Sequence, residues 1–176
     1  MLLLVLGLVL PQQYQVNKSI IIQAEQVIIE PYINDFSKWQ LWSPWEAVDP
    51  SIIFDVSNPS SGVGAHQFWQ SNWGFGEMTI TNITPSTIHL NILFNEEHIA
   101  TGTINFTRKA NGNLISCTLL GEVTTPILGG YLALISQYIL TNTVELGLNN
   151  LKTVVQLQTI QDIEVKNDNT SSTGEN

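Results

Sequence analysis

The chain has 176 residues, a length that fits one domain and excludes two large ones. Hydrophobic residues make up 43% and charged residues 12%, so the chain can bury a sizeable core and lacks the composition of a disordered protein. Six Lys and Arg against fifteen Asp and Glu give a net charge of −9, which excludes a nucleic acid held through its phosphates as the expected partner. The single cysteine, Cys117, excludes an internal disulfide and a cysteine-based zinc site.

The N-terminal segment, residues 1–11, begins with the uninterrupted apolar run Met1–Leu10 and ends at Pro11. As a helix, the run would cover about 15 Å, roughly half of the hydrocarbon core of a bilayer. It has neither the basic start nor the small-residue cleavage site of a secretory signal. Two interpretations stay open: the remaining part of a membrane anchor or export signal, or an apolar arm that packs on the domain. We therefore expect membrane association through Met1–Leu10, with a cytoplasmic protein as the alternative.

The first regular elements are predicted just after this segment. Over residues 19–24, Ile20, Ile22 and Ala24 alternate against Ser19 and Gln23, which predicts a half-buried strand. A short helix is expected next, and Pro31 places its start near Glu30, because proline suits the first position of a helix and disrupts its interior.

Six further segments, separated by turn residues, alternate between apolar and polar positions. In residues 87–94, for example, Ile88, Leu90, Ile92 and Phe94 share one face, which predicts a sheet with one apolar and one polar side. Turn chemistry such as Asn111–Gly112 between apolar runs favours antiparallel hairpins. The predicted strands cover residues 52–56, 65–70, 78–83, 87–94, 98–107 and 114–120.

A long helix is predicted from Tyr131 to about Val155, after the glycine pair at 129–130. Its apolar residues recur at steps of four, four, three and four, and they form one stripe: Leu140, Val144, Leu148, Leu151 and Val155. Such a stripe needs a sheet to cover it. Residues 161–176 are polar with little to bury, so we expect a disordered tail there and a folded domain over residues 16–160.

The order of these elements, together with particular residues, resembles the SRPBCC or START-like (helix-grip) superfamily. The region Ala24–Asp49 is similar to the polyketide cyclase/dehydrase-like branch, with Asp35 ending a short helix, the segment WQLWSPW ending at Trp45, and Pro50 after an acidic residue. Positions elsewhere that fit the resemblance are Gly62, Gly64, Trp69, Ser71, Met78–Ile80, Pro85, Phe94, Gly147–Leu148 and Leu151–Lys152. The resemblance covers residues 16–155.

The resemblance implies an α+β fold in which a curved antiparallel sheet of six to seven strands wraps around the long C-terminal helix. Short helices would follow the first strand, and an elongated cavity would lie between the sheet and the long helix. Members of the branch often begin with one membrane-spanning segment followed by a proline, which agrees with the anchor interpretation of Met1–Leu10.

Aromatic side chains are the candidates for the cavity wall, because ligand pockets are mostly apolar with a few polar groups that fix orientation. We select Trp45, Trp69, Phe94 and Phe106 as ligand-binding candidates, although ordinary core packing would equally explain buried aromatics. Trp39, Trp42 and Trp45 recur every three residues, so they either flank the cavity mouth or close the end of the sheet.

Catalytic chemistry has little support in the sequence. Glu77 follows Gly74–Gly76 at the start of a predicted strand and is a weak candidate for a general acid or base. The three histidines are scattered, which disfavours a metal site, and no cofactor motif is complete. We therefore expect neither a metal nor a cofactor.

Three hypotheses for function follow. The domain binds a hydrophobic small molecule or lipid without catalysis; or it is a cyclase or dehydratase that uses a cavity carboxylate; or side chains fill the cavity and leave an interaction module. The sequence does not name the ligand, decide whether any catalysis occurs, or fix the oligomeric state.

Overall fold

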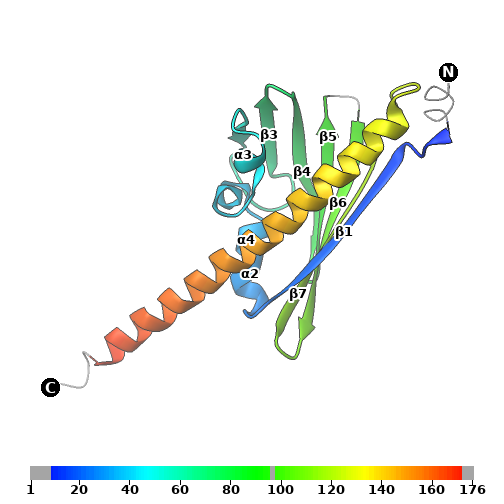
Figure 1. Cartoon of the computed structure of the whole chain (residues 1–176). Coiled ribbons are helices and arrows are strands. Elements are labelled where there is room, and N and C mark those ends of the chain that lie inside the picture. The colour runs from blue at the N-terminus through cyan, green and yellow to red at the C-terminus, as the bar shows by residue number, and fades with distance from the viewer. Residues whose placement is uncertain (1–8, 96–97, 172–176) are drawn as a thin grey trace.

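The computed structural model describes residues 9–95 and 98–171, and it has an α+β architecture in which one sheet packs against one long helix (Figure 1). The elements in chain order are β1 (Gln13–Ile22), α2 (Gln26–Ile33), the 3₁₀-helix η1 (Phe36–Leu41), α3 (Trp45–Val48), β2 (Ile53–Val56), β3 (His66–Ser71), β4 (Gly74–Thr84), β5 (Thr87–Phe94), β6 (His98–Lys109), β7 (Gly112–Glu122) and α4 (Gly129–Ser171). The predicted fold class is confirmed.

The sheet has seven antiparallel strands in the order β1-β7-β6-β5-β4-β3-β2. Strands β2 to β7 form a meander, and β1 pairs with the last strand, from Gln13 opposite Glu122 to Ile22 opposite Asn113. Strand β1 therefore begins six residues before the predicted strand. Its first half alternates as clearly as the second, with Tyr14 and Val16 buried between exposed neighbours.

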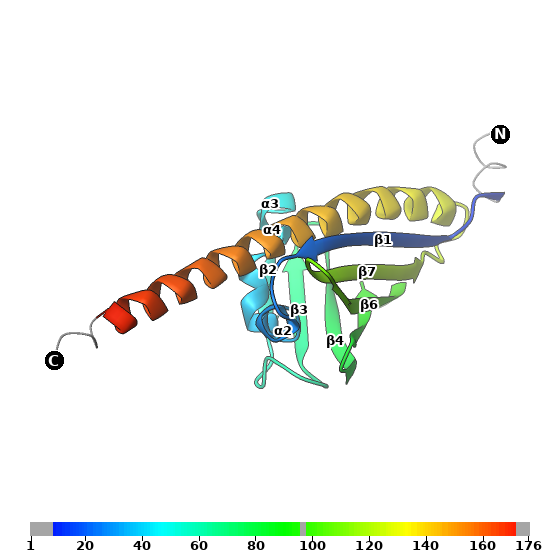
Figure 2. The same cartoon turned by 90° about the horizontal axis from the view of Figure 1, so that it is seen from below.

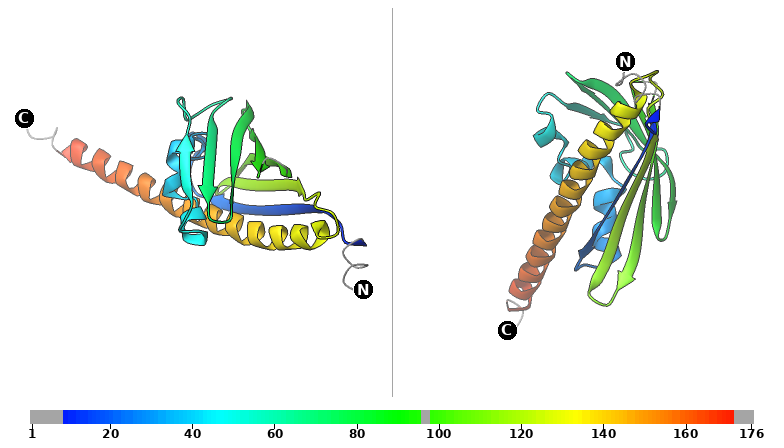
Figure 3. Two further views of the ribbon diagram at one scale, coloured as in Figure 1. Left: turned by 90° about the horizontal axis from the view of Figure 1, so that it is seen from above. Right: turned by 45° about the vertical axis from the view of Figure 1, so that its right-hand side comes forward.

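The sheet curves around α4, which crosses it obliquely and runs beside β1 (Figures 2 and 3). The inward residues of the strands and one side of α4 bury each other, because each element has a single apolar face. Leu148, Leu151 and Val155 from the predicted stripe are buried in this core, and Val144 packs against it. The C-terminal part of α4 continues past the edge of the sheet (Figure 1).

Helix α2 starts earlier than its proline predicted. It begins at Gln26, and Pro31 lies inside it, two residues before the helix ends at Ile33. Because proline has no N–H, one helical hydrogen bond to the carbonyl of Val27 is lost. Val27 is exposed, so water can bind this carbonyl instead. Burial of Ile29 and Ile33 holds the helix on the core despite this loss.

The predicted disordered tail is wrong over residues 161–171, which continue α4 as helix to Ser171. Once a helix is nucleated by its packed turns, each further residue adds a hydrogen bond, and polar residues such as Gln, Glu and Lys extend it readily. The composition of this segment showed the lack of apolar residues to bury, and that does not prevent helix propagation. Residues 172–176 lie outside the described residues.

At the other end, the N-terminal apolar run lies mostly outside the described residues. Val9 is exposed, and Leu10 packs so closely on Gly130 that a side-chain Cβ there would meet the Leu10 Cβ at 2.3 Å. None of the helices in residues 9–95 and 98–171 is both long and apolar enough to cross a membrane.

Candidate functional site

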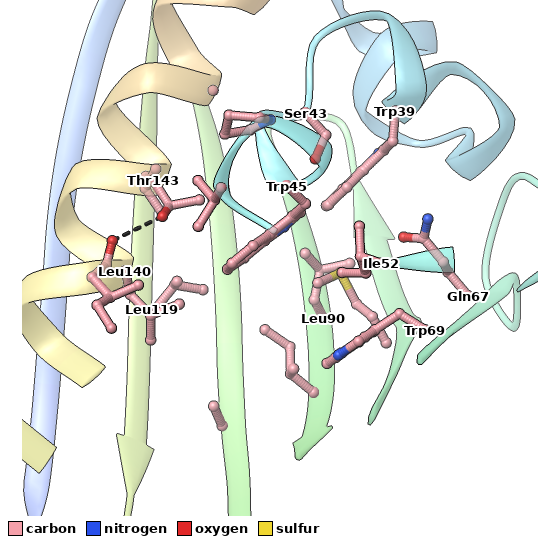
Figure 4. Close-up of a pocket in the computed structure, with 18 of the residues that line it drawn as sticks. Trp39, Ser43, Trp45, Ile52, Gln67, Trp69, Leu90, Leu119, Leu140 and Thr143 are labelled. Carbon is pink, nitrogen blue, oxygen red and sulfur yellow. Dashed lines mark hydrogen bonds between the residues drawn. The ribbon is translucent and has the colours of Figure 1, made fainter. Parts of the chain in front are cut away.

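A cavity of about 550 Å³ lies between α4 and the inner face of the sheet, within the range of small-molecule sites (Figure 4). Strands β3 to β7 supply its floor, and the N-terminal half of α4 and the segment around α3 supply its roof and side. Its lining is predominantly apolar. Exposed Trp73 and Phe75, from the turn between β3 and β4 and the start of β4, and Val48 at the end of α3 belong to the lining and mark where the cavity reaches the surface.

The tryptophan-rich segment is fixed by its indole N–H groups. Trp39 Nε1 donates to the carbonyl oxygen of Ile33 at 3.0 Å, and Trp42 Nε1 donates to that of Tyr32 at 2.8 Å. The two rings lie 4.9 Å apart between centroids. Both hydrogen bonds end on the last turn of α2, so the segment is tied to that helix by its own side chains.

The same segment also contacts α4. Asn150 Nδ2 donates to the carbonyl oxygen of Trp42 at 3.1 Å, and a Cβ at Gly147 would meet Pro44 at 3.2 Å and the Trp42 ring at 3.4 Å. Glycine at this position therefore allows the segment to lie directly on α4. Trp39, Trp42 and Trp45 all line the cavity, so the cluster forms part of the cavity wall.

Three of the four predicted aromatic residues line the cavity: Trp45, Trp69 and Phe94. The rings of Trp69 and Phe94 meet edge to face, with centroids 5.5 Å apart. Trp69 lies over Gly76, where a Cβ would come within 2.3 Å of its ring. Figure 4 shows Trp45 reaching from α3 into the space between α4 and the sheet.

Phe106 does not line the cavity, so its predicted place in the cavity wall is wrong. It is buried in the core on the same face of the sheet, but its backbone N–H donates to Ser86, in the turn that precedes β5. The cavity instead lies toward the far end of β5, at Leu90, Ile92 and Phe94. The alternation of β6 gave the correct face and could not give the position along it.

Glu77 lies outside the cavity lining, so the prediction of a cavity carboxylate at this position is wrong. Its neighbour Met78 points into the cavity, and successive side chains of a strand point to opposite faces. The Glu77 carboxylate is 46% exposed and lies 3.7 Å from Nε2 of His66.

Asp49, at the end of α3, is the carboxylate that lines the cavity in the described part of the chain. Its Oδ1 accepts hydrogen bonds from the backbone N–H of Ser51 at 3.0 Å and from the Ser51 hydroxyl at 2.6 Å. The Ser51 hydroxyl is the main cause that lowers the pKa of Asp49. The group is therefore an anion at neutral pH and holds no proton to donate.

Most other polar groups of the lining bond within the protein. Thr143 Oγ1 donates to the carbonyl of Ile139 at 2.8 Å, as the dashed line in Figure 4 shows. Asn95 Oδ1 accepts from the Phe75 N–H at 3.0 Å, and the Ser71 hydroxyl donates to the Gly74 carbonyl at 3.3 Å.

Two polar groups of the lining differ from these. Ser43 Oγ is completely buried and has no hydrogen-bond partner among the described residues. Gln67 is only 5% exposed as a residue, its amide has no hydrogen-bond partner among the described residues, and unlike the Ser43 hydroxyl the amide is not completely buried. Sequence reasoning did not single out either residue. Gln67 was recognisable, because it is the polar member of the inward row Ala65, Gln67 and Trp69.

Two further ionisable side chains of the lining stay uncharged. Burial raises the pKa of the Tyr14 phenol and raises that of the Cys117 thiol to about 12. No group of three or more His, Cys, Asp or Glu side chains in the described part of the chain is placed to hold a metal ion. Asp49 is thus the charged side chain of a lining that contains no Lys, Arg or His.

By sequence, the chain matches no protein-family model and no curated protein. By structure, it is similar to the KanY protein, with a TM-score of 0.64 and 12% identity over 82% of this chain and 98% of that one. It is also similar to the protein TTHA0849 from Thermus thermophilus, with a TM-score of 0.59 and 19% identity over 82% and 98%. A truncated norcoclaurine synthase from Thalictrum flavum gives a TM-score of 0.58 and 9% identity over 81% and 93%.

These similarities and the seven-stranded sheet around α4 define the class: the chain has the helix-grip fold, as predicted. At identities of 9–19%, they establish the fold and do not single out the polyketide cyclase/dehydrase-like branch.

Proposed function

We propose that the domain binds a hydrophobic small molecule or lipid in the cavity between its sheet and α4, without catalysing a reaction. The observation that carries the proposal is the cavity itself, whose 550 Å³ and mostly apolar, aromatic lining match those of ligand sites. A packed interior has few voids larger than a water molecule, so side chains alone do not explain a space of this size. The hypothesis of a cavity filled by Trp and Phe side chains has no support in this geometry.

The first test is native mass spectrometry of the full chain after gentle purification, which should show a co-purified apolar ligand. In parallel, the neutral dye N-phenyl-1-naphthylamine should fluoresce on binding to the delipidated protein. Ala100 lines the cavity from β6, so Ala100→Leu should fill part of the space and weaken dye binding.

The matched control is Ile99→Leu, on the same strand and with its side chain exposed on the opposite face, which should leave dye binding unchanged. If the wild-type chain carries no ligand and does not bind the dye, the proposal fails. It also fails if Ala100→Leu, like the control Ile99→Leu, binds the dye as tightly as the wild type does.

A cyclase or dehydratase is the alternative, since norcoclaurine synthase shows that a protein of this fold can be an enzyme. Such a reaction needs a cavity group that exchanges a proton near neutral pH. Glu77 lies outside the cavity, and Asp49 is held as an anion by Ser51. The geometry therefore favours binding over catalysis.

We also propose that the N-terminal end of the domain lies against a lipid bilayer. Residues 123–144 contain no charged residue, and Leu128, Leu132, Ile135 and Ile139 form an exposed apolar row on α4 and the turn before it. Leu10 packs on Gly130, so the apolar run Met1–Leu10 joins the domain at the same end as this row. Its lack of charge suits the apolar part of a bilayer.

Flotation of the full chain with phosphatidylcholine vesicles tests this location. The wild-type chain should float with the vesicles, and the double variant Leu132→Glu/Ile135→Glu should float less. Val27→Glu, at an exposed position of α2, should float as the wild type does. A wild-type chain that stays in the dense fraction would refute membrane association.

A further inference from the structure

We propose that the cavity takes ligands with an apolar body and one positively charged group, such as a hydrophobic amine in its ammonium form, and that the carboxylate of Asp49 pairs with this charge. The inference rests on the proposed binding function and specifies the ligand class. It is carried by the position of Asp49, which is the charged side chain in the wall of a predominantly apolar cavity in the described part of the chain.

Asp49 stands at the mouth of the cavity, where a ligand can reach it. The exposed residues Val48 and Trp73 mark this mouth, and Asp49 directly follows Val48 and is itself only half-buried. The Ser51 hydroxyl donates to Asp49 and accepts from the Asn72 N–H at 3.0 Å, so hydrogen bonds join Asp49 to the turn that carries Trp73. A ligand whose apolar body enters the cavity can therefore keep a charged end beside this carboxylate.

The Asp49 carboxylate is held in place and has no positive partner. The Ser51 hydroxyl is the main cause that lowers the pKa of Asp49, and the Ser71 hydroxyl adds to it. Both hydroxyls are neutral, and none of the ion pairs among the described residues involves Asp49. An ionised carboxylate has about four acceptor positions, of which Ser51 uses two. The carboxylate can therefore still accept a hydrogen bond from an ammonium group.

The charges of the cavity wall favour a cation over an anion. The lining has no Lys, Arg or His, so an anion would find no partner there and would be repelled by Asp49. Transfer of a carboxylate or phosphate from water into such a site has a desolvation cost that nothing offsets. The net charge of −9 acts in the same direction over a longer range, because it attracts cations to the protein.

The test compares three ligands that differ only in the group attached to one naphthalene ring. At pH 7, 1-naphthylmethylamine is a cation, 1-naphthylmethanol is neutral and 1-naphthoate is an anion. Isothermal titration calorimetry with the full wild-type chain at low salt should rank their affinities in that order. We expect the amine to bind about fivefold more tightly than the alcohol, the effect of one ion pair at a partly exposed site. Screening in about 1 M NaCl should remove most of this preference.

Two variants locate the ion pair. Asp49→Asn removes the charge and keeps an oxygen that can accept from the Ser51 N–H. It should bind the amine no more tightly than the alcohol, and unchanged binding of the alcohol would show that the cavity is intact. The matched control is Asp55→Asn, at an exposed position of β2 outside the cavity lining. It changes the net charge by the same amount and should keep the preference for the amine.

The outcomes separate this inference from the proposed function. If none of the three compounds binds to the wild-type chain, the proposal of a hydrophobic binding site is contradicted together with the inference. If the alcohol binds as tightly as the amine, or if Asp49→Asn keeps the preference for the amine, the site binds apolar ligands without an ion pair at Asp49.

Two further results would overturn the inference. Loss of the preference in Asp55→Asn as well would assign the attraction to the net charge of the chain and not to Asp49. A preference for the amine that persists in about 1 M NaCl would contradict an ion pair at the cavity mouth, whether or not Asp49→Asn folds.

Discussion

The two ends of the space between the sheet and α4 are built from similar residues and packed differently. At one end, α2 covers the sheet: Gln26 Nε2 donates to the Pro85 carbonyl in the turn before β5, and Ile22 and Ile29 are completely buried. At the other end, the tryptophan-rich segment lies on α4 and encloses the cavity. The apolar face of each strand continues through both ends, so the covering segment decides whether the space is filled.

The covering side chains of the two segments differ. Helix α2 buries the branched side chains of Ile29 and Ile33 in the core. The segment from Trp39 to Trp45 has rigid rings held by hydrogen bonds to α2, and they stand at the side of the space as a wall. The cavity thus lies at one end of a continuous core, and the other end is closely packed.

The largest expected effect compares isoleucines at the two ends. Ile22→Ala, in the packed end, should lower the free energy of unfolding by about 3 kcal/mol, because it removes a fully buried side chain and leaves a void. Ile92→Ala, in the cavity wall, should cost at least about 1 kcal/mol less, because that side chain already borders open space.

Urea unfolding, followed by tryptophan fluorescence, measures the free energy of unfolding of the two variants. Equal losses for the two variants would mean that the cavity wall is packed as tightly as the end under α2.

The reverse experiment adds side-chain volume by replacing an alanine at each end with leucine. Ala65→Leu adds volume at a buried position away from the cavity and should destabilise the fold by about 1–3 kcal/mol. Ala100→Leu adds the same volume next to the cavity and should cost less than about 1 kcal/mol, because empty space accepts it. Thermal unfolding of the two proteins, measured in parallel, tests the comparison. The opposite ranking would show that the space beside Ala100 is not available to a side chain.

A smaller loss of stability is expected for a change at Asp35, which hydrogen-bonds to Ser37 in η1 and to Ser60. Its Oδ1 accepts from the N–H of Ser37 at 3.0 Å, where η1 begins, and from the Ser60 hydroxyl at 2.7 Å. Partial burial acts to raise the pKa of Asp35, but hydrogen bonds from Ser37 and Ser60 outweigh it and lower the pKa. Asp35→Ala should cost about 1 kcal/mol at pH 7, as for the loss of a helix cap.

The pH dependence follows from the sign of this shift. With a lowered folded-state pKa, the unfolded chain binds the proton more readily, so the stabilisation is full above the unfolded pKa, about 3.9, and is lost as the pH falls through the folded value. The difference in stability between wild type and Asp35→Ala should therefore shrink in acid. A difference that stays constant from pH 7 to pH 2 would contradict the role of the ionised carboxylate.

The smallest predicted effect concerns the reactivity of the Cys117 thiol. Burial raises the pKa of Cys117 to about 12, so at neutral pH this residue of the cavity wall is a thiol. Because only the thiolate reacts, alkylation by iodoacetamide should rise about tenfold for each pH unit between pH 7 and 10. Mass spectrometry of the single cysteine follows the rate. A plateau near pH 9, as for an exposed cysteine, would show that the cavity wall does not bury the sulfur.

Several elements were predictable because one side of each is buried. The strand over residues 87–94 was predicted with the bounds that β5 has, and the other strands of the meander within four residues, since alternation records which face packs on the core. The start of α2 was missed because Pro31 dominated the local signal, while burial of Ile29 and Ile33 decided the outcome. The end of α4 was missed because composition reports burial and not helix propagation.

The sequence by itself determined the order of the elements, the inward face of each strand and the rigid segment that ends in Trp45, because these depend on periodicity and local chemistry. Only the tertiary structure decided that Trp69 and Phe94 border the cavity while Phe106 fills the core, and that Gln67 belongs to the cavity lining. The reason is that periodicity assigns a side chain to a face, whereas its depth along that face depends on which distant segment covers it.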